Sequence, residues 1–213
     1  MNSKTTDGYL AIPTTGKGRP VLVLHAWWGL NDTIRQFCIR LAEQGFVAFA
    51  PDLYQGKVTD TIEGAEELSQ SMDEEKANAS IEAAAAFLSQ HPATASSGIA
   101  VIGFSLGAYF ALKLSNDIPD QIHSVVVFYG TGPTDFSRSH AAYLGHYAEN
   151  DQFEPQSQVD GLKATLQQAG RQVTFYQYPD TGHWFFEPDR TQAYHPDAAA
   201  LAWERTLEFL KKV

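Results

Sequence analysis

Two hydrophobic patterns alternate along the chain and predict alternating strands and helices. Short apolar runs rich in β-branched residues predict strands at 21–24, 46–50, 99–102, 125–128, 143–146 and 173–178. Ile34, Phe37, Cys38 and Leu41 recur at helical spacing, and further helices are expected from about residue 105, from about 155 to 169, and through Trp203 and Leu210. The chain therefore alternates between β and α elements over most of its length.

Several of the predicted strands are apolar at every position. Strands of this kind are buried on both faces, which is typical of parallel sheets covered by helices. The sequence favours an α/β doubly wound fold, a mostly parallel sheet with helices on both faces, as a single domain over residues 1–213. The predicted elements leave no insertion long enough for a lid domain. In such sheets the ligand site lies beyond the carboxyl ends of the strands.

An acidic stretch from residue 60 to residue 82 carries eight carboxylates and a single basic residue, Lys76. It is interpreted as a pair of solvated helices without a catalytic role. The apolar positions expected to be buried there are Ile62, Leu68, Met72, Ile81 and Phe87.

Charge and cysteine content exclude several classes of partner and site. The chain has 15 basic and 25 acidic residues, and the net charge of −10 would repel nucleic acid and anionic membranes. The single cysteine, Cys38, excludes an internal disulfide and a cysteine-based zinc site. The sequence has no signal-like apolar run and no His-Glu-x-x-His spacing. A cytoplasmic protein without metal or cofactor is expected, with a monomer favoured.

The segment 103–107, Gly-Phe-Ser-Leu-Gly, lies between a predicted strand and a predicted helix. This Gly-x-Ser-x-Gly pattern is typical of a nucleophile elbow, where small residues two positions from the serine let the strand and the helix approach closely. A glycine-flanked turn without chemistry would show the same letters, but the flanking elements favour the elbow. Ser105 is therefore the predicted nucleophile.

A serine hydroxyl needs a base, and the base needs a carboxylate that holds it in the right tautomer. Among seven histidines, His183 follows the last predicted strand in a glycine-containing loop, which is where the base is expected. His25 ends an earlier strand and is expected to shape the loop opposite the nucleophile. We predict His183 as the general base.

The acid is expected in the loop after the strand at 143–146. Asp151 lies there before Pro155, which can start a helix, and Glu149 and Glu154 are rival acids in the same loop. The order Ser105, Asp151, His183 is the order found in α/β-hydrolases. Backbone amides can hold the oxyanion, and the expected donors are Leu106 and Trp27.

Six segments carry a family resemblance: 25–32 (HAWWGLND), 50–54 (APDLY), 103–107 (GFSLG), 150–155 (NDQFEP), 182–185 (GHWF) and 202–205 (AWER). Together they make the chain resemble the dienelactone hydrolase family of the α/β-hydrolase fold, in order and without large gaps from residue 20 to residue 212. The resemblance implies a nucleophile, acid and base at Ser105, Asp151 and His183, and oxyanion amides at Leu106 and Trp27.

The chain departs from the family pattern at three positions. The name-giving enzymes have a cysteine nucleophile where this chain has Ser105, and a glutamate next to the nucleophile where it has Ala26. Because a thiol can ionise and a serine hydroxyl cannot, losing both features together is consistent with a working serine enzyme. The third position, four residues after the histidine, carries a substrate-binding arginine in those enzymes and Glu187 here.

Glu187 is expected to repel an anionic substrate, so a neutral ester or lactone with an apolar or aromatic part fits best. The aromatic residues expected to line the site are Trp28, Tyr54, Phe104, Trp184 and Phe185. The predicted function is a serine hydrolase that cleaves a small ester or lactone through an acyl-enzyme. The alternatives are a non-catalytic ligand-binding homologue, and an acyltransferase or thioesterase with the same three residues.

Overall fold

Strands and helices form two units in the computed structural model, which describes residues 7–133 and 135–212. The N-terminal unit is Met1–Ile99 and the C-terminal unit is Ala100–Val213. No helix among the described residues is both long enough and apolar enough to cross a membrane. The single domain over residues 1–213 stays a prediction.

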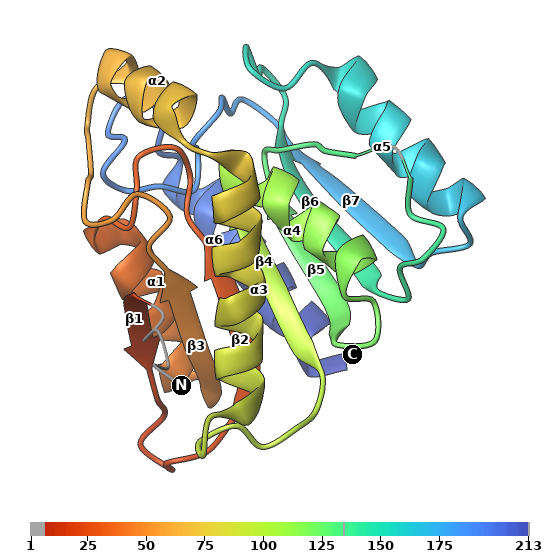
Figure 1. The fold of residues 1–213 in the computed structure, drawn as a ribbon. Helices are drawn as coiled ribbons and strands as arrows, with labels where there is room; N and C mark the ends of the chain where they lie inside the picture. The colour runs from red at the N-terminus through yellow and green to blue at the C-terminus, as the bar shows by residue number, and fades with distance from the viewer. Residues whose placement is uncertain (1–6, 134, 213) are drawn as a thin grey trace. The chain divides into compact units, whose positions relative to one another are not determined.

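The N-terminal unit contains a three-stranded part of the sheet in the order β1-β3-β2. Its elements are β1 (Gly8–Ala11), β2 (Arg19–Leu24), α1 (Asp32–Glu43), β3 (Phe46–Pro51), α2 (Ile62–Ser71) and α3 (Glu74–Gln90). β2 is parallel to β3, with Val21 opposite Ala48, whereas β1 is antiparallel to β3. Helix α1 packs on β3 and β1, and α3 packs on β3 and β2 from the opposite face (Figure 1).

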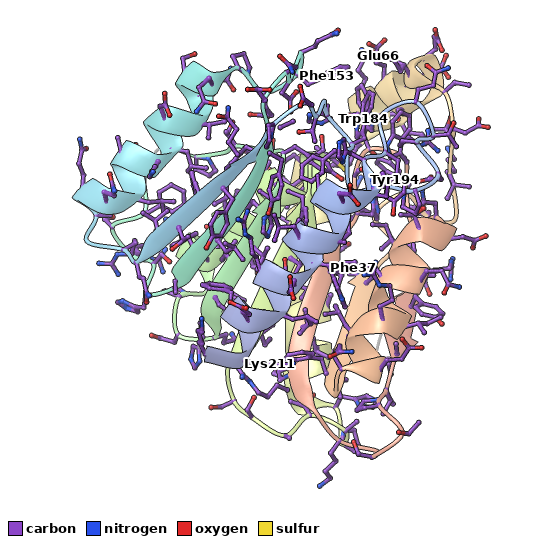
Figure 2. All side chains as sticks on the ribbon, turned by 180° about the vertical axis from the view of Figure 1, so that it is seen from behind. Phe37, Glu66, Phe153, Trp184, Tyr194 and Lys211 are labelled. Atoms are coloured by element: carbon purple, nitrogen blue, oxygen red, sulfur yellow. The ribbon has the colours of Figure 1, made fainter. Side chains whose placement is uncertain are left out.

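The C-terminal unit contains four strands in the order β4-β5-β6-β7. Its elements are β4 (Ile99–Phe104), α4 (Leu106–Asp117), β5 (Ile122–Phe128), β6 (Ala142–Ala148), α5 (Gln156–Gln168), β7 (Val173–Tyr178) and α6 (Pro196–Lys212). The pairs β5/β6 and β6/β7 are parallel. Helices α4 and α5 lie on one face and α6 on the other, as Figures 1 and 2 show from opposite sides.

Burial on both faces explains why these strands are apolar. Every residue of β4 is buried, and β5 exposes only His123. The predicted α/β fold, a mostly parallel sheet with helices on both faces, is therefore confirmed.

The structure corrects two details of the sequence interpretation. Strand β1 was not predicted, because its four residues are only partly buried and carry too little pattern to be recognised. In the acidic stretch, Ile81 is buried as expected, but Ile62 is 43% exposed and Ala65 is the residue that α2 buries. The small side chain of Ala65 makes the buried contact of α2 that was expected of Ile62.

Backbone hydrogen bonds link the carboxyl ends of the strands in the C-terminal unit. The amide of Ser105 donates to Phe128 O at 2.9 Å, and the amide of Tyr129 donates to His146 O at 2.8 Å. The amide of Glu149 donates to Tyr178 O at 3.1 Å. The residue that follows each of β4, β5 and β6 is thus fixed to the end of the neighbouring strand, and these residues share one edge of the sheet.

Candidate active site

Ser105 lies in a strained turn between β4 and α4. Its φ of 49° and ψ of −111° are unfavourable for any residue other than glycine. Its carbonyl oxygen accepts a hydrogen bond from the Ala108 amide at 2.8 Å. A Cβ on Gly103 would collide with the backbone carbonyl of Gly107, and one on Gly130 would lie 2.6 Å from the carbonyl oxygen of Ser105. The glycines therefore allow the close packing that holds the serine at the tip of the turn.

Strain concentrates at this edge of the C-terminal unit. Among the described residues, five non-glycine residues have a positive φ, and four of them lie here: Ser105, Tyr129, Asp180 and Trp184. Such conformations persist only where surrounding contacts hold them, and they are typical of functional sites. The remaining one is Gln55, in the N-terminal unit.

His183 connects Ser105 to Asp151. Its Nε2 lies 3.0 Å from Ser105 Oγ, and its Nδ1 lies 2.7 Å from Asp151 Oδ2 and 2.9 Å from Asp151 Oδ1. A proton on Nδ1 is donated to the carboxylate, which leaves the lone pair of Nε2 to accept the serine hydroxyl proton. The histidine is 6% exposed, so solvent competes little for these bonds.

Asp151 has the donors that a buried carboxylate requires. Besides the imidazole, its Oδ1 accepts the backbone amides of Phe153 at 2.8 Å and Glu154 at 2.9 Å. The side chain is 4% exposed. These bonds orient the carboxylate toward the histidine and compensate for its removal from water.

Backbone and side-chain hydrogen bonds join the acid loop to the histidine loop. The Asn150 amide donates to Thr181 O at 2.9 Å, and the Thr181 hydroxyl donates to Tyr178 O at 2.7 Å. The Asp180 amide donates to Glu149 Oε2 at 2.9 Å. The positions of Asp151 and His183 are therefore set by contacts between loops that follow β6 and β7.

The rival acids take other partners. Glu149 accepts the Asp180 amide, as described above, and Glu154 has a buried Oε2 without a hydrogen-bond partner among the described residues. Burial is the main cause that raises the pKa of Glu154 above its ordinary value. Of the three carboxylates considered from the sequence, Asp151 is the one that bonds to His183.

The two predicted oxyanion donors lie in different units. Leu106 is the first residue of α4, so its amide is among those that a helix leaves without an intrahelical acceptor. Trp27 lies in the N-terminal unit, in a turn closed by the Gly29 amide donating to Ala26 O at 3.2 Å. The role of both amides stays a prediction.

His25 organises the loops of the N-terminal unit. Its Nδ1 lies 2.6 Å from Ala26 O, and its Nε2 accepts the Leu53 amide at 3.2 Å. Both bonds are satisfied by a neutral ring that carries its proton on Nδ1. Burial lowers the pKa of His25, so the ring stays neutral and connects the turn after β2 to the loop after β3.

Four of the five aromatic residues predicted to line the site are buried. Phe104 and Phe185 are 1% and 0% exposed, and Phe104 stacks on Phe128 with ring centroids 4.7 Å apart. Trp28 and Tyr54 are 2% and 6% exposed in the N-terminal unit. Side chains this deeply buried expose little surface, and Tyr54 lines a pocket with Asp52 and Leu53 in the same unit, so a substrate-binding role for these four stays a prediction. Trp184 is partly exposed and stays a candidate.

Phe153 was missed by the sequence interpretation although it lies beside His183. It is 44% exposed, and its ring centroid lies 5.0 Å from that of His183 and 4.9 Å from that of Trp184. Figure 2 shows Phe153 and Trp184 together at one end of the C-terminal unit. The only available signal was its place two residues after Asp151.

Tyr129 was also missed as a neighbour of the histidine, and its hydrogen bond to Glu187 was not expected from the sequence. The Tyr129 ring centroid lies 4.8 Å from that of His183, and the Tyr129 hydroxyl donates to Glu187 Oε1 at 2.7 Å. Glu187 is 1% exposed, and burial raises its pKa to about 8. The expected repulsion of an anionic substrate by Glu187 requires an ionised carboxylate facing that substrate, whereas the side chain is buried against Tyr129.

The described residues of the site do not form a cluster of metal ligands. Among residues 7–133 and 135–212, no group of three or more His, Cys, Asp or Glu side chains is arranged to hold a metal ion. A hydroxyl, an imidazole and a carboxylate bonded in this order are the groups that a serine nucleophile requires.

Comparison with known proteins places this site in a family context. The model of the dienelactone hydrolase family matches residues 6–213. Protein usf of Aquifex pyrophilus is 32% identical over 220 residues, covering 99% of this chain and 95% of that protein. A Bradyrhizobium protein named "Probable 2-oxo-3-(5-oxofuran-2-ylidene)propanoate lactonase" is 30% identical, covering 99% of this chain and 90% of that protein.

A solved structure agrees with these relatives. The crystal structure of a protein named "Putative Dienelactone Hydrolase" from Klebsiella pneumoniae superposes with a TM-score of 0.84 at 25% identity. The match covers 97% of this chain and 92% of the Klebsiella chain.

Proposed function

Since the chain belongs to the dienelactone hydrolase family, a family of ester and lactone hydrolases, we propose that it is a serine hydrolase with Ser105 as nucleophile, His183 as base and Asp151 as orienting acid. The observation that carries the proposal is the continuous contact from Ser105 Oγ through His183 to Asp151, at 3.0 Å and 2.7 Å. The predicted order of the three residues along the chain supports the same assignment.

The first half of the proposed reaction forms an acyl-enzyme. Ser105 Oγ attacks the carbonyl carbon while His183 Nε2 takes the hydroxyl proton, and the negative charge moves to the carbonyl oxygen. The amides of Leu106 and Trp27 are the proposed donors to that oxygen. When the intermediate collapses, the bond to the leaving oxygen breaks, and the imidazolium returns the proton to that oxygen.

Water completes the cycle. His183 accepts a proton from a water molecule as its oxygen attacks the acyl carbon, and the second tetrahedral intermediate then releases Ser105 with its proton restored. An ester yields an acid and an alcohol, whereas a lactone yields one hydroxy acid because its two products remain joined. The Asp151 carboxylate stabilises the imidazolium that forms in both halves.

A fluorophosphonate probe tests the nucleophile. Wild-type protein should be labelled on Ser105 and should hydrolyse short p-nitrophenyl esters, whereas Ser105→Ala should do neither. Ser115→Ala is the matched control, because Ser115 is a buried, hydrogen-bonded serine on α4, the helix that follows Ser105. Labelling that survives Ser105→Ala would move the nucleophile elsewhere. Labelling of Ser105 without ester turnover would favour an acyltransferase, and the absence of labelling would favour a binding protein.

We further propose that the substrate is neutral. The family's arginine position carries Glu187 here, so the chain lacks the cation that would pair with a substrate carboxylate at that place. The net charge of −10 also disfavours an anion. The matched pair p-nitrophenyl acetate and p-nitrophenyl hemisuccinate tests this, because the second adds an ionised carboxylate. A higher kcat/KM for the hemisuccinate would contradict the proposal.

A further inference from the structure

Tyr129 and Glu187 form a buried pair beside His183 that the proposed reaction does not use. Their side chains are joined by the 2.7 Å hydrogen bond, and the two residues are 0% and 1% exposed. We propose that Glu187 is a positioning residue, which acts through Tyr129 to hold the His183 imidazole so that Nε2 faces Ser105. This inference rests on the proposed function, because it concerns the orientation of the same base.

The hydrogen bonds of His183 do not fix its ring by themselves. Asp151 contacts Nδ1 and Ser105 contacts Nε2, so each ring nitrogen has one side-chain partner. Rotation about the Cβ–Cγ bond would carry both nitrogens away from their partners at once, and a rigid ring packed against the imidazole restricts that rotation. A base that rotates away from the serine loses the geometry that proton transfer needs.

Tyr129 is suited to set that plane because it is anchored at both ends. Its ring meets the imidazole at an interplanar angle of 57°, its backbone amide donates to His146 O, and its hydroxyl donates to Glu187. The exposed Phe153 also contacts His183, but nearly half of its surface faces solvent. Tyr129 is therefore held more rigidly than Phe153, by hydrogen bonds from its backbone amide and from its hydroxyl.

Glu187 belongs to the same loop as the histidine. The Glu187 amide donates to Trp184 O at 2.9 Å, and the Phe185 amide donates to Gly182 O at 3.3 Å, so two successive turns carry residues 182–187. The hydrogen bond to Tyr129 therefore connects the histidine loop to the end of β5. Positive φ angles at Tyr129 (38°) and Trp184 (66°) show that both backbones depend on such contacts.

The pair works through an acceptor oxygen rather than through a charge. Burial raises the pKa of Glu187 to about 8, with Asp189 raising it and the Tyr129 hydrogen bond and Arg190 lowering it. Near neutral pH the carboxyl is therefore mostly protonated, and its carbonyl oxygen accepts the hydrogen bond from the Tyr129 hydroxyl. A glutamine at this position keeps that oxygen, whereas a leucine removes it.

Four variants test the inference. In Tyr129→Phe and Glu187→Leu, kcat for p-nitrophenyl acetate should fall by about 10- to 100-fold with little change in KM, because misplaced catalytic groups cost rates of this order. Glu187→Gln should restore kcat to near the wild-type value. Tyr143→Phe is the matched control: Tyr143 is 1% exposed and bonds to Ser115 and Ser139, outside the site. It should keep the wild-type kcat.

Each rate is divided by the concentration of protein that a fluorophosphonate labels on Ser105, so that poorly folded protein does not lower the measured kcat. Should Glu187→Leu fail to fold, Tyr129→Phe decides alone. The inference is overturned if Tyr129→Phe keeps the wild-type kcat, if the loss appears in KM alone, if Glu187→Gln is as slow as Glu187→Leu, or if Tyr143→Phe is equally slow. Wild-type protein that the probe does not label on Ser105 would instead defeat the proposed function.

Discussion

Two carboxyl groups adjoin the histidine system from different loops, and they differ in their hydrogen-bond donors. Asp151 accepts the imidazole and two backbone amides, whereas Glu187 accepts one phenolic hydroxyl. Both side chains are almost fully buried, at 4% and 1% exposure. Burial alone therefore does not decide what a carboxyl group does. Several donors let a buried group act as a carboxylate, and a single donor favours the uncharged acid.

Amide substitution at each position should separate the two groups most sharply. Asp151→Asn should lower kcat by about 10⁴-fold, because an amide can force the wrong histidine tautomer, while Glu187→Gln should keep most of the activity. Steady-state hydrolysis of p-nitrophenyl acetate measures both. Comparable losses in the two variants would show that the groups do not differ in role.

The pH dependence of stability should distinguish wild-type protein from Glu187→Gln. The pKa of Glu187 is raised from 4.5 to about 8 in the folded state, so between these values the native state holds a proton that the unfolded chain has released. Its contribution to stability is complete below pH 4.5 and is lost as the pH rises to about 8. The loss amounts to about 1 kcal/mol per pH unit.

The glutamine in Glu187→Gln does not titrate, and the contributions of all other titratable groups to the pH dependence of stability cancel when the two proteins are compared. The variant should therefore gain stability relative to wild type as the pH rises from 5 to 8, as measured by urea unfolding at several pH values. A difference in unfolding free energy that stays constant with pH would mean that Glu187 is ionised throughout.

The aromatic neighbours of His183 extend the same comparison. Phe153 is exposed where Tyr129 is anchored, so Phe153→Ala should raise KM for phenyl esters and leave kcat unchanged. The increase should be up to about 10-fold, because aromatic contacts contribute about 0.5–1.5 kcal/mol. Methyl esters with the same acyl group are the control and should show a smaller change. A loss confined to kcat would make Phe153 a positioning residue like Tyr129.

Glu154 should show the smallest effect. Burial raises its pKa, as it does for Glu187, but Glu154 is only partly buried. Glu154→Gln should therefore reduce the pH dependence of stability in the same direction as Glu187→Gln and by a smaller amount, with kcat unchanged. Urea unfolding at pH 5 and pH 8 measures the difference. A large drop in kcat would return Glu154 to the list of candidate acids.

Local patterns in the sequence determined the fold class and the place of the candidate nucleophile. Uniformly apolar runs are a local consequence of burial on both faces of a parallel sheet, and the spacing of Gly103, Ser105 and Gly107 reflects the steric demands of one turn. His183 and Asp151 could be nominated because each follows a recognisable strand. The resemblance to a family then indicated an ester or lactone hydrolase.

Only the tertiary structure decided which side chains meet and which are buried. It brought Asp151, rather than Glu149 or Glu154, to His183. It also placed Tyr129 against the imidazole, although Tyr129 and His183 are far apart along the chain. It also turned Glu187 inward and buried most of the aromatic residues expected at the site. Hydrogen-bond partners and solvent exposure depend on residues that are distant along the chain, so a pattern of neighbouring letters cannot specify them.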